Sequence, residues 1–78
     1  MSKLTQIFSS ILNIPESAVT QELSPENTAA WDSLNAIILV TEIEKAYNIK
    51  FSYDEVMAVK NFADAVQLVQ SKGGNIQE

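Results

Sequence analysis

Several residue types that usually carry chemistry are absent from this chain. It has no cysteine, which excludes disulfide bonds, a thiol nucleophile and zinc–thiolate coordination. It has no histidine, the commonest general base and metal ligand. All five basic residues are lysine, so no arginine can bind a phosphate through two hydrogen bonds. We therefore expect a protein that carries or binds something, with no metal site, and not an enzyme.

Long apolar runs are also missing. No segment contains the ~18 uncharged apolar residues that a membrane-spanning helix requires. The first residues lack the basic and apolar regions of a signal peptide, so the expected location is cytoplasmic. Hydrophobic residues make up 46% of the 78 residues, which is enough for a small globular fold and predicts a single domain over residues 1–78.

The net charge is negative and unevenly distributed. Ten acidic residues against five lysines give −5, which disfavours nucleic acid and anionic membranes as partners. Between Leu4 and Glu44 there is no basic residue, whereas the later lysines are spread among acids. This acidic half either attracts a basic surface on a partner or is a solvated face that keeps the protein soluble.

Apolar spacing predicts a first helix from about residue 4 to 13. Its buried stripe contains Leu4, Ile7, Phe8, Ile11 and Leu12. Ser2 is expected to cap its start, and Pro15 to end it near Asn13. Residues 14–31 are expected to form a long loop, broken by a short helical turn at 16–19. Val19, Leu23 and Trp31 would pin this loop to the core.

A second helix is expected to begin at Asp32 or Ser33 and to end at Tyr47 or Asn48. Its core face contains Ala36, Leu39, Val40, Ile43, Ala46 and Tyr47, and the opposite side contains Leu34, Ile37, Ile38 and Thr41. A helix in a small bundle buries only one side. Leu34, Ile37 and Ile38 are therefore candidates for an exposed docking patch. The alternative is that the preceding loop covers this side.

Two capped helices complete the prediction. Ser52 and Glu55 form a capping-box pattern that opens a short helix, and Asn61 caps a final helix that Gly73-Gly74 ends. The buried stripe of the final helix contains Phe62, Ala65, Val66 and Val69. The fold class is all-α: a small four-helix bundle with a long loop between helices 1 and 2 and a short third helix. Residues 73–78 are expected to form a frayed tail.

The sequence Trp31-Asp32-Ser33-Leu34 lies where the long loop meets a helix start. Free backbone N–H groups at a helix start favour negative charge, and so favour a phosphate ester on the Ser33 hydroxyl. Asp32 would cap the helix, and Leu34 would follow on its outward side. Alternatively, Asp32 and Ser33 only cap the helix, which is their commoner role. A nucleophilic serine is excluded because histidine is absent and Lys45 lies three turns away.

From Leu4 to Lys72 the chain resembles the acyl carrier proteins. The resemblance rests on the amphipathic first helix, the long loop, Asp32-Ser33-Leu34, the helix 39–47 that leads to Ile49-Lys50-Phe51, and the late capped helices. It implies a four-helix bundle. It also implies that a phosphopantetheinyl transferase attaches 4′-phosphopantetheine from coenzyme A to Ser33. The thiol of that arm would carry acyl groups as thioesters.

The resemblance further implies partners and residue roles. Partners would be acyl-loading and acyl-processing enzymes, such as an acyltransferase or ligase and a ketosynthase, and the carrier would be a monomer. Asp32 and Leu34 match the family motif around the serine, and Glu44 matches a position where carriers show an acid to basic partners. With the apolar patch, the candidate partner-binding residues are Leu34, Ile37, Ile38, Glu42 and Glu44.

Three positions depart from the pattern of fatty-acid-synthesis carriers. Those carriers usually have acids where this chain has Asn35 and Ile38, and a small residue where it has Trp31. The expected docking face is therefore less acidic and more apolar, which favours polyketide or other specialised biosynthesis over housekeeping fatty acid synthesis. Trp31 is expected to pack in the core and anchor the long loop, the commoner role of a lone tryptophan, or else to flank the arm or a partner.

Two other functions stay open from the sequence. A peptidyl or aryl carrier would have the same fold and arm, but usually has glycines and a less acidic surface around the serine. A non-modified helical adaptor would use Leu34, Ile37 and Ile38 to bind a protein, with Ser33 acting only as a cap.

Overall fold

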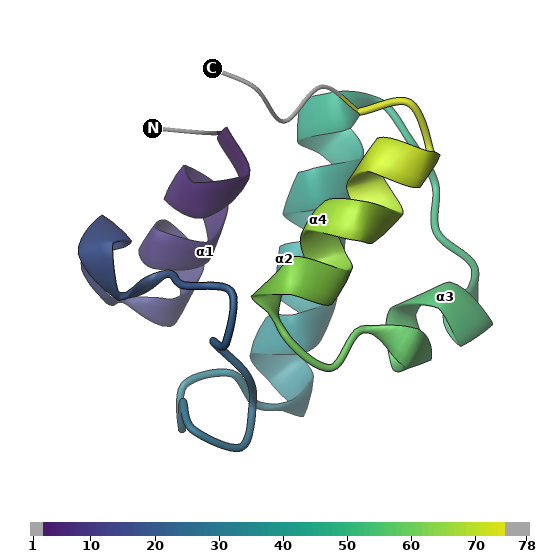
Figure 1. The fold of residues 1–78 in the computed structure, drawn as a ribbon. Coiled ribbons are helices and arrows are strands. Elements are labelled where there is room, and N and C mark those ends of the chain that lie inside the picture. The colour runs from purple at the N-terminus through teal and green to yellow at the C-terminus, as the bar shows by residue number, and fades with distance from the viewer. Residues whose placement is uncertain (1–2, 75–78) are drawn as a thin grey trace.

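The computed structural model describes residues 3–74. It contains α1 (Lys3–Leu12), a short 3-10 turn η1 (Glu16–Ala18), α2 (Ser33–Tyr47), α3 (Tyr53–Ala58) and α4 (Phe62–Ser71), with no strand in this range. In Figure 1, α1 and α3 lie on opposite sides of α2, and α4 crosses in front. The all-α bundle with a long first connection and a short third helix is confirmed. The predicted cap at Ser2 and tail residues 75–78 lie outside the described range.

Three of the helices end in the same way. A residue close to each helix end has a positive φ: Asn13 (57°) and Asn48 (56°) directly follow α1 and α2, and Gly73 (91°) lies two residues after Ser71, the last residue of α4. In each case the next N–H donates to the carbonyl five residues earlier, at 3.1, 3.2 and 2.9 Å. This Schellman arrangement satisfies carbonyl groups that a helix end leaves unpaired. Gly73 and Gly74, the first residues of the predicted tail, are therefore hydrogen-bonded to α4.

The predicted caps of the two last helices are confirmed. The Ser52 Oγ accepts from the Glu55 N–H at 3.2 Å, and the Glu55 carboxylate accepts from the Ser52 N–H at 2.8 Å. At α4, the Asn61 Oδ1 accepts from the Asp64 N–H at 2.8 Å. Each cap fixes a helix start by a contact between residues three apart, which is why sequence alone could locate both.

A small apolar core holds the helices together. The buried residues are Leu4, Phe8, Leu12, Leu23, Trp31, Leu39, Ile43, Phe62, Ala65 and Val69. The ring of Phe8 is central, because it makes edge-on contacts with Trp31 at 5.2 Å and with Phe62 at 4.9 Å between ring centroids. One aromatic cluster thereby joins α1, the long loop and α4. Phe51 is half-buried and packs against this core.

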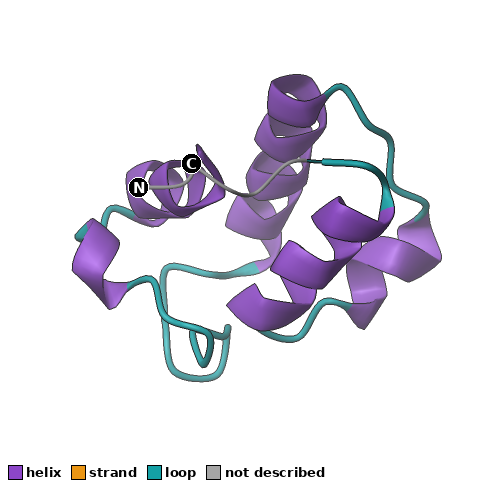
Figure 2. Cartoon of the chain, turned by 45° about the horizontal axis from the view of Figure 1, so that its top comes forward, coloured by secondary structure: helices purple, strands orange, loops and turns teal. Residues whose placement is uncertain are grey.

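The long loop packs on one end of the bundle and not on the outer side of α2 (Figure 2). Leu23 is buried, and its carbonyl accepts from the Phe62 N–H at 2.8 Å, one of the N–H groups that the start of α4 leaves free. The helical turn expected at 16–19 is confirmed as η1. The loop is therefore joined to the start of α4, and the side of α2 that carries Leu34 and Ile37 stays exposed.

Candidate functional site

The start of α2 presents Ser33 to solvent. Asp32 has an extended backbone, and its Oδ1 accepts from the Asn35 N–H at 2.9 Å, so the predicted cap is confirmed. Ser33 is consequently the first residue of the helix, and it is exposed. Asp32 is also exposed, which leaves the approach to the Ser33 hydroxyl open.

The loop that leads into this helix is held in place by contacts on its other side. Trp31 is only 6% exposed, so the core-plug prediction is confirmed over the interpretation that it flanks the arm. The Trp31 N–H donates to the Thr28 carbonyl at 3.0 Å, and the Asn35 side-chain amide donates to the Ala30 carbonyl at 2.6 Å. Asn35 thus ties the loop to the first turn of α2, a role that the sequence analysis missed because it depends on the path of the loop.

The electrostatics of this helix start suit a phosphate ester. The first-turn N–H groups have no carbonyl partner within the helix, and the helix dipole places partial positive charge there. Among the described residues, the Asp32 carboxylate accepts one hydrogen bond, from the Asn35 N–H. The chain has no histidine or cysteine to activate Ser33, and residues 3–74 contain no cluster of acids that could hold a metal ion. The helix start therefore favours a negatively charged group beside Ser33.

The outer side of α2 is apolar and open near Ser33. Leu34 is 67% exposed and Ile37 is 65% exposed, so the alternative in which the loop covers them is wrong. Ile38 is 39% exposed and turns toward α1, where it lines a shallow groove with Ile7 and Ile11. The predicted patch therefore divides: Leu34 and Ile37 face solvent, and Ile38 lies at the seam with α1.

Both acidic residues predicted to bind partners already have partners in the chain. The Glu44 carboxylate accepts from the Phe51 N–H at 2.8 Å and thereby holds the connection to α3. Glu42 lies 3.6 Å from the Lys45 ammonium in an exposed ion pair. The Lys45 ammonium offsets part of the negative charge of Glu42, whereas Glu44 keeps its full charge because a backbone N–H is neutral.

Helix α3 adds two exposed apolar side chains that the sequence analysis did not assign to the site. Tyr53 is 77% exposed and Met57 is 59% exposed, and their spacing of four residues puts them on one side of the helix. The spacing of four residues was the signal in the sequence that could have placed Tyr53 and Met57 on the same side of a helix. The helix has only six residues, so periodicity could not show which side faces the core.

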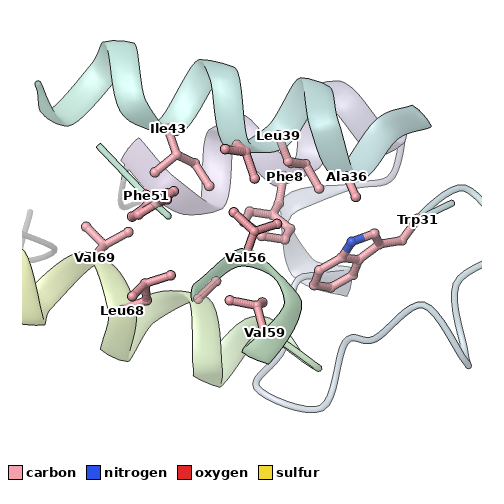
Figure 3. A pocket seen from close by; sticks show the side chains of 12 residues that line it. Phe8, Trp31, Ala36, Leu39, Ile43, Phe51, Val56, Val59, Leu68 and Val69 are labelled. Atoms are coloured by element: carbon pink, nitrogen blue, oxygen red, sulfur yellow. The ribbon is translucent and has the colours of Figure 1, made fainter. Parts of the chain in front are cut away.

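A small apolar cavity lies inside the bundle between α2, α3 and α4 (Figure 3). Ala36, Leu39 and Val40 line it from α2, and Val56 lines it from α3. Its volume is about 60 Å³. That is less than half of the ~150 Å³ cavity that binds benzene in an engineered protein core. A chain of more than a few carbon atoms can enter only if the lining side chains move apart.

Comparisons with known proteins identify the class. The family described as "Phosphopantetheine attachment site" matches residues 2–69. The chain is 31% identical over 70 residues to an acyl carrier protein of Azobacteroides pseudotrichonymphae, covering 88% of this chain and 82% of the relative. It is 33% identical over 70 residues to an acyl carrier protein of Guillardia theta, covering 90% of this chain and 86% of the relative.

Solved structures agree with this class. The solution structure of a holo acyl carrier protein from Geobacter metallireducens has a TM-score of 0.80 and 36% identity, covering 88% of this chain and 79% of the other. A second neighbour, described as a putative acyl carrier protein from Mycobacterium tuberculosis, has a TM-score of 0.78 and 22% identity, covering 87% of this chain and 90% of the other, and supports the fold alone.

The chain belongs to the acyl carrier protein family, whose members bear a covalent phosphopantetheine group. It is a carrier of acyl groups and not an enzyme. The prosthetic group supplies the thiol that the chain, lacking cysteine, does not encode. None of the described helices is long and apolar enough to span a bilayer.

Proposed function

We propose that Ser33 is the residue to which the phosphopantetheine arm is attached. The observation that carries this proposal is the position of the Ser33 hydroxyl: exposed, on the first turn of α2, directly after a capping aspartate. The free first-turn N–H groups stabilise the negative charge of a phosphate ester. Asp32 positions the serine by capping the helix, and Leu34 forms part of the surface beside it.

We infer further that the protein serves polyketide or another specialised biosynthesis. Support comes from the departures at Asn35 and Ile38, where fatty-acid-synthesis carriers usually have acids. Asn35 is used to fix the loop, and Ile38 lies at the seam with α1. The face that partner enzymes would meet is thus more apolar than is usual for fatty acid synthesis. A peptidyl or aryl carrier is the second candidate. Loading of the modified protein with amino acids or aryl acids, in place of other acyl groups, would identify it.

The partner-binding residues proposed for this function are Leu34, Ile37, Ile38, Glu42 and Glu44. The partners are a phosphopantetheinyl transferase and the acyl-loading and acyl-processing enzymes, an acyltransferase or ligase and a ketosynthase among them. We propose a monomer that works in the cytoplasm as a single domain, binding neither nucleic acid nor membranes. The net charge of −5 supports this exclusion of anionic partners.

The attachment is tested by intact mass after incubation with coenzyme A and a broad-specificity phosphopantetheinyl transferase. We expect one added arm on the wild type and on Ser10→Ala, and none on Ser33→Ala. Ser10 is a matched control because it is an exposed serine on another helix. No addition to the folded wild type, with a control carrier fully modified, would support the non-modified adaptor instead.

A further inference from the structure

We propose that the shallow groove between α1 and α2 is a binding site for the acyl chain that the arm carries, and that this chain is apolar, unbranched and of medium length. The floor of the groove, called here the α1–α2 groove, contains Ile7 and Ile11 of α1 and Ile38 of α2. The proposal rests on the proposed attachment of the arm to Ser33. It deepens that function by naming the class of cargo and the place where the protein holds it.

The interior of the bundle offers too little space for such a chain. The cavity between α2, α3 and α4 has a volume of about 60 Å³, whereas the α1–α2 groove has about 340 Å³. The groove is open on one side, and its volume is about twice that of the ~150 Å³ cavity that binds benzene in an engineered protein. Binding in the groove also leaves the packed core undisturbed, whereas insertion into the cavity would push its lining side chains apart.

An apolar track connects Ser33 to the groove. Leu34 follows Ser33 directly and is 67% exposed, and Ile38 lies one turn further along the same side of α2. Ile38 is 39% exposed and lines the groove. Residues 33–41 contain no charged side chain. A chain that starts beside Ser33 therefore reaches the groove over apolar surface.

The arm is long enough to bring the thioester to the edge of the groove. At 1.5 Å and 100° per residue, Ile38 lies ~7.5 Å along the helix axis from Ser33 and ~140° around it. From its phosphate to its sulfur, the arm has the length of about four extended residues, ~14 Å. The acyl chain then lies in the groove itself.

The direction of α1 lets the chain run away from Ser33 along the seam. The Lys3 ammonium donates to the Ala46 carbonyl at 3.5 Å, so the start of α1 lies beside the end of α2 and the two helices are antiparallel (Figure 1). Ile11 is therefore nearer to the Ser33 end of the groove, and Ile7 lies one turn further from it.

The length of the apolar floor determines the length of chain that fits. Lys3 and Glu42 line the groove at the end far from Ser33, where the Glu42 carboxylate lies 3.6 Å from the Lys45 ammonium. From Ile11 to Lys3 the seam is ~12 Å long, which matches an extended chain of about ten carbon atoms. Such a chain gains from burial against the isoleucines and ends before the charged groups, whose desolvation would be unfavourable.

The test compares the holo protein with the protein that carries a decanoyl chain. A broad-specificity transferase loads isotope-labelled protein from decanoyl coenzyme A; it joins the acylated arm to Ser33 as a phosphodiester and releases adenosine 3′,5′-bisphosphate. Isotope-filtered NMR detects contacts between the unlabelled chain and protein methyl groups, and thermal unfolding gives Tm. The variant is Ile38→Glu. Its matched control is Ile37→Glu, which adds the same charge at the next position, where the side chain is 65% exposed and does not line the groove.

We expect contacts from the chain to the methyl groups of Ile7, Ile11 and Ile38, and none to Val56 and Val59, which line the interior cavity. Loading should raise Tm by about 4 °C or more in the wild type and in Ile37→Glu, because the chain binds only the folded state. In Ile38→Glu the rise should fall to less than about half, because a carboxylate in the floor opposes burial of the chain.

Two results would overturn the groove as the binding site. Contacts to Val56 or Val59, or a rise in Tm that Ile38→Glu retains in full, would place the chain in the interior cavity. The absence of contacts to the methyl groups of Ile7, Ile11 and Ile38 would mean that the groove does not hold the chain.

Failure of the proposed function gives a different result. If intact mass shows no acylated arm on the folded wild type while a control carrier is loaded, the attachment at Ser33 is wrong, and the proposal for the groove is wrong with it. If the wild type is loaded at Ser33 and the contacts to the groove are missing, only the proposal for the groove is wrong.

Discussion

At the scale of single residues, Asp32 and Trp31 together position Ser33, the proposed attachment site, one through a helix cap and the other through the core. Asp32 caps α2 through the Asn35 N–H, which places Ser33 on the first turn. Trp31 turns inward and packs edge-on against Phe8. Neighbouring residues thus have opposite environments, one exposed and one buried, and Ser33 takes its orientation from both.

Replacing Asp32 with alanine should lower the free energy of unfolding by about 1 kcal/mol, because the Asn35 N–H loses its acceptor. Asp32→Ser should retain most of the stability, since serine is also a good cap. Urea unfolding at neutral pH measures both. Equal stability of Asp32→Ala and wild type would mean that the cap contributes nothing in solution.

Replacing Trp31 with alanine should have a far larger effect. The loss of a buried aromatic side chain costs about 3–5 kcal/mol, against a total of roughly 4–12 kcal/mol for a domain of this size. Trp31→Phe should be milder, because a ring still contacts Phe8. The urea concentration at the midpoint of unfolding should decrease in the order wild type, Trp31→Phe, Trp31→Ala. A loss below about 1 kcal/mol in Trp31→Ala would contradict its role as a core plug.

At the scale of elements, α3 is the part that depends most on its neighbours. A helix of six residues is far below the length at which isolated helices are stable. Its start is held by the capping box, its inner side by Val56 in the cavity lining, and its α4 side by the Glu55–Lys72 contact. The exposed positions of Tyr53 and Met57 follow from these three contacts.

The Glu55–Lys72 contact makes a prediction about pH. The hydrogen bond from Lys72, with a further one from the Ser52 N–H, lowers the pKa of Glu55 below its usual value. A lowered pKa in the folded state stabilises the fold above the unfolded-state pKa, and this contribution is lost as pH falls through the folded-state pKa. Carboxyl NMR titration should therefore find a higher Glu55 pKa in Lys72→Met than in wild type. An unchanged pKa in the variant would mean that the contact does not persist in solution.

The sequence predicts contacts between residues close together in the chain, and it does not predict contacts that depend on how distant segments pack. The caps at Asp32, Ser52 and Asn61 are contacts between residues three apart, and each was predicted correctly. The hydrogen bond from the Asn35 side chain to the loop and that from the Phe51 N–H to Glu44 join parts of the chain whose relative path no local pattern specifies.

On the outer side of α2, the sequence likewise predicted the local pattern but not the packing against other helices. Helical spacing correctly separated Leu34, Ile37 and Ile38 from the core face. It could not show that Ile38 turns toward α1, because that depends on where α1 packs. Nor could it assign Tyr53 and Met57, because the relative placement of α2 and α3 is set by packing around the cavity.

At the scale of the whole molecule, the features add up to a scaffold and not a catalyst. The chain offers one exposed serine at the start of its longest helix, an apolar surface beside it and an interior with little free space. It has no histidine or cysteine, so the reactive sulfur has to come from the prosthetic group. It follows that the carrier presents its acyl group, and that partner enzymes perform the chemistry.

The most direct test of this account is to locate the arm on the chain. Wild-type protein would be modified with coenzyme A and a broad-specificity transferase, and then fragmented in the mass spectrometer. The account predicts the added mass on the fragment that contains Ser33 and on no other serine-containing fragment. Added mass on another serine, or none while a control carrier is fully modified, would contradict the assignment of Ser33.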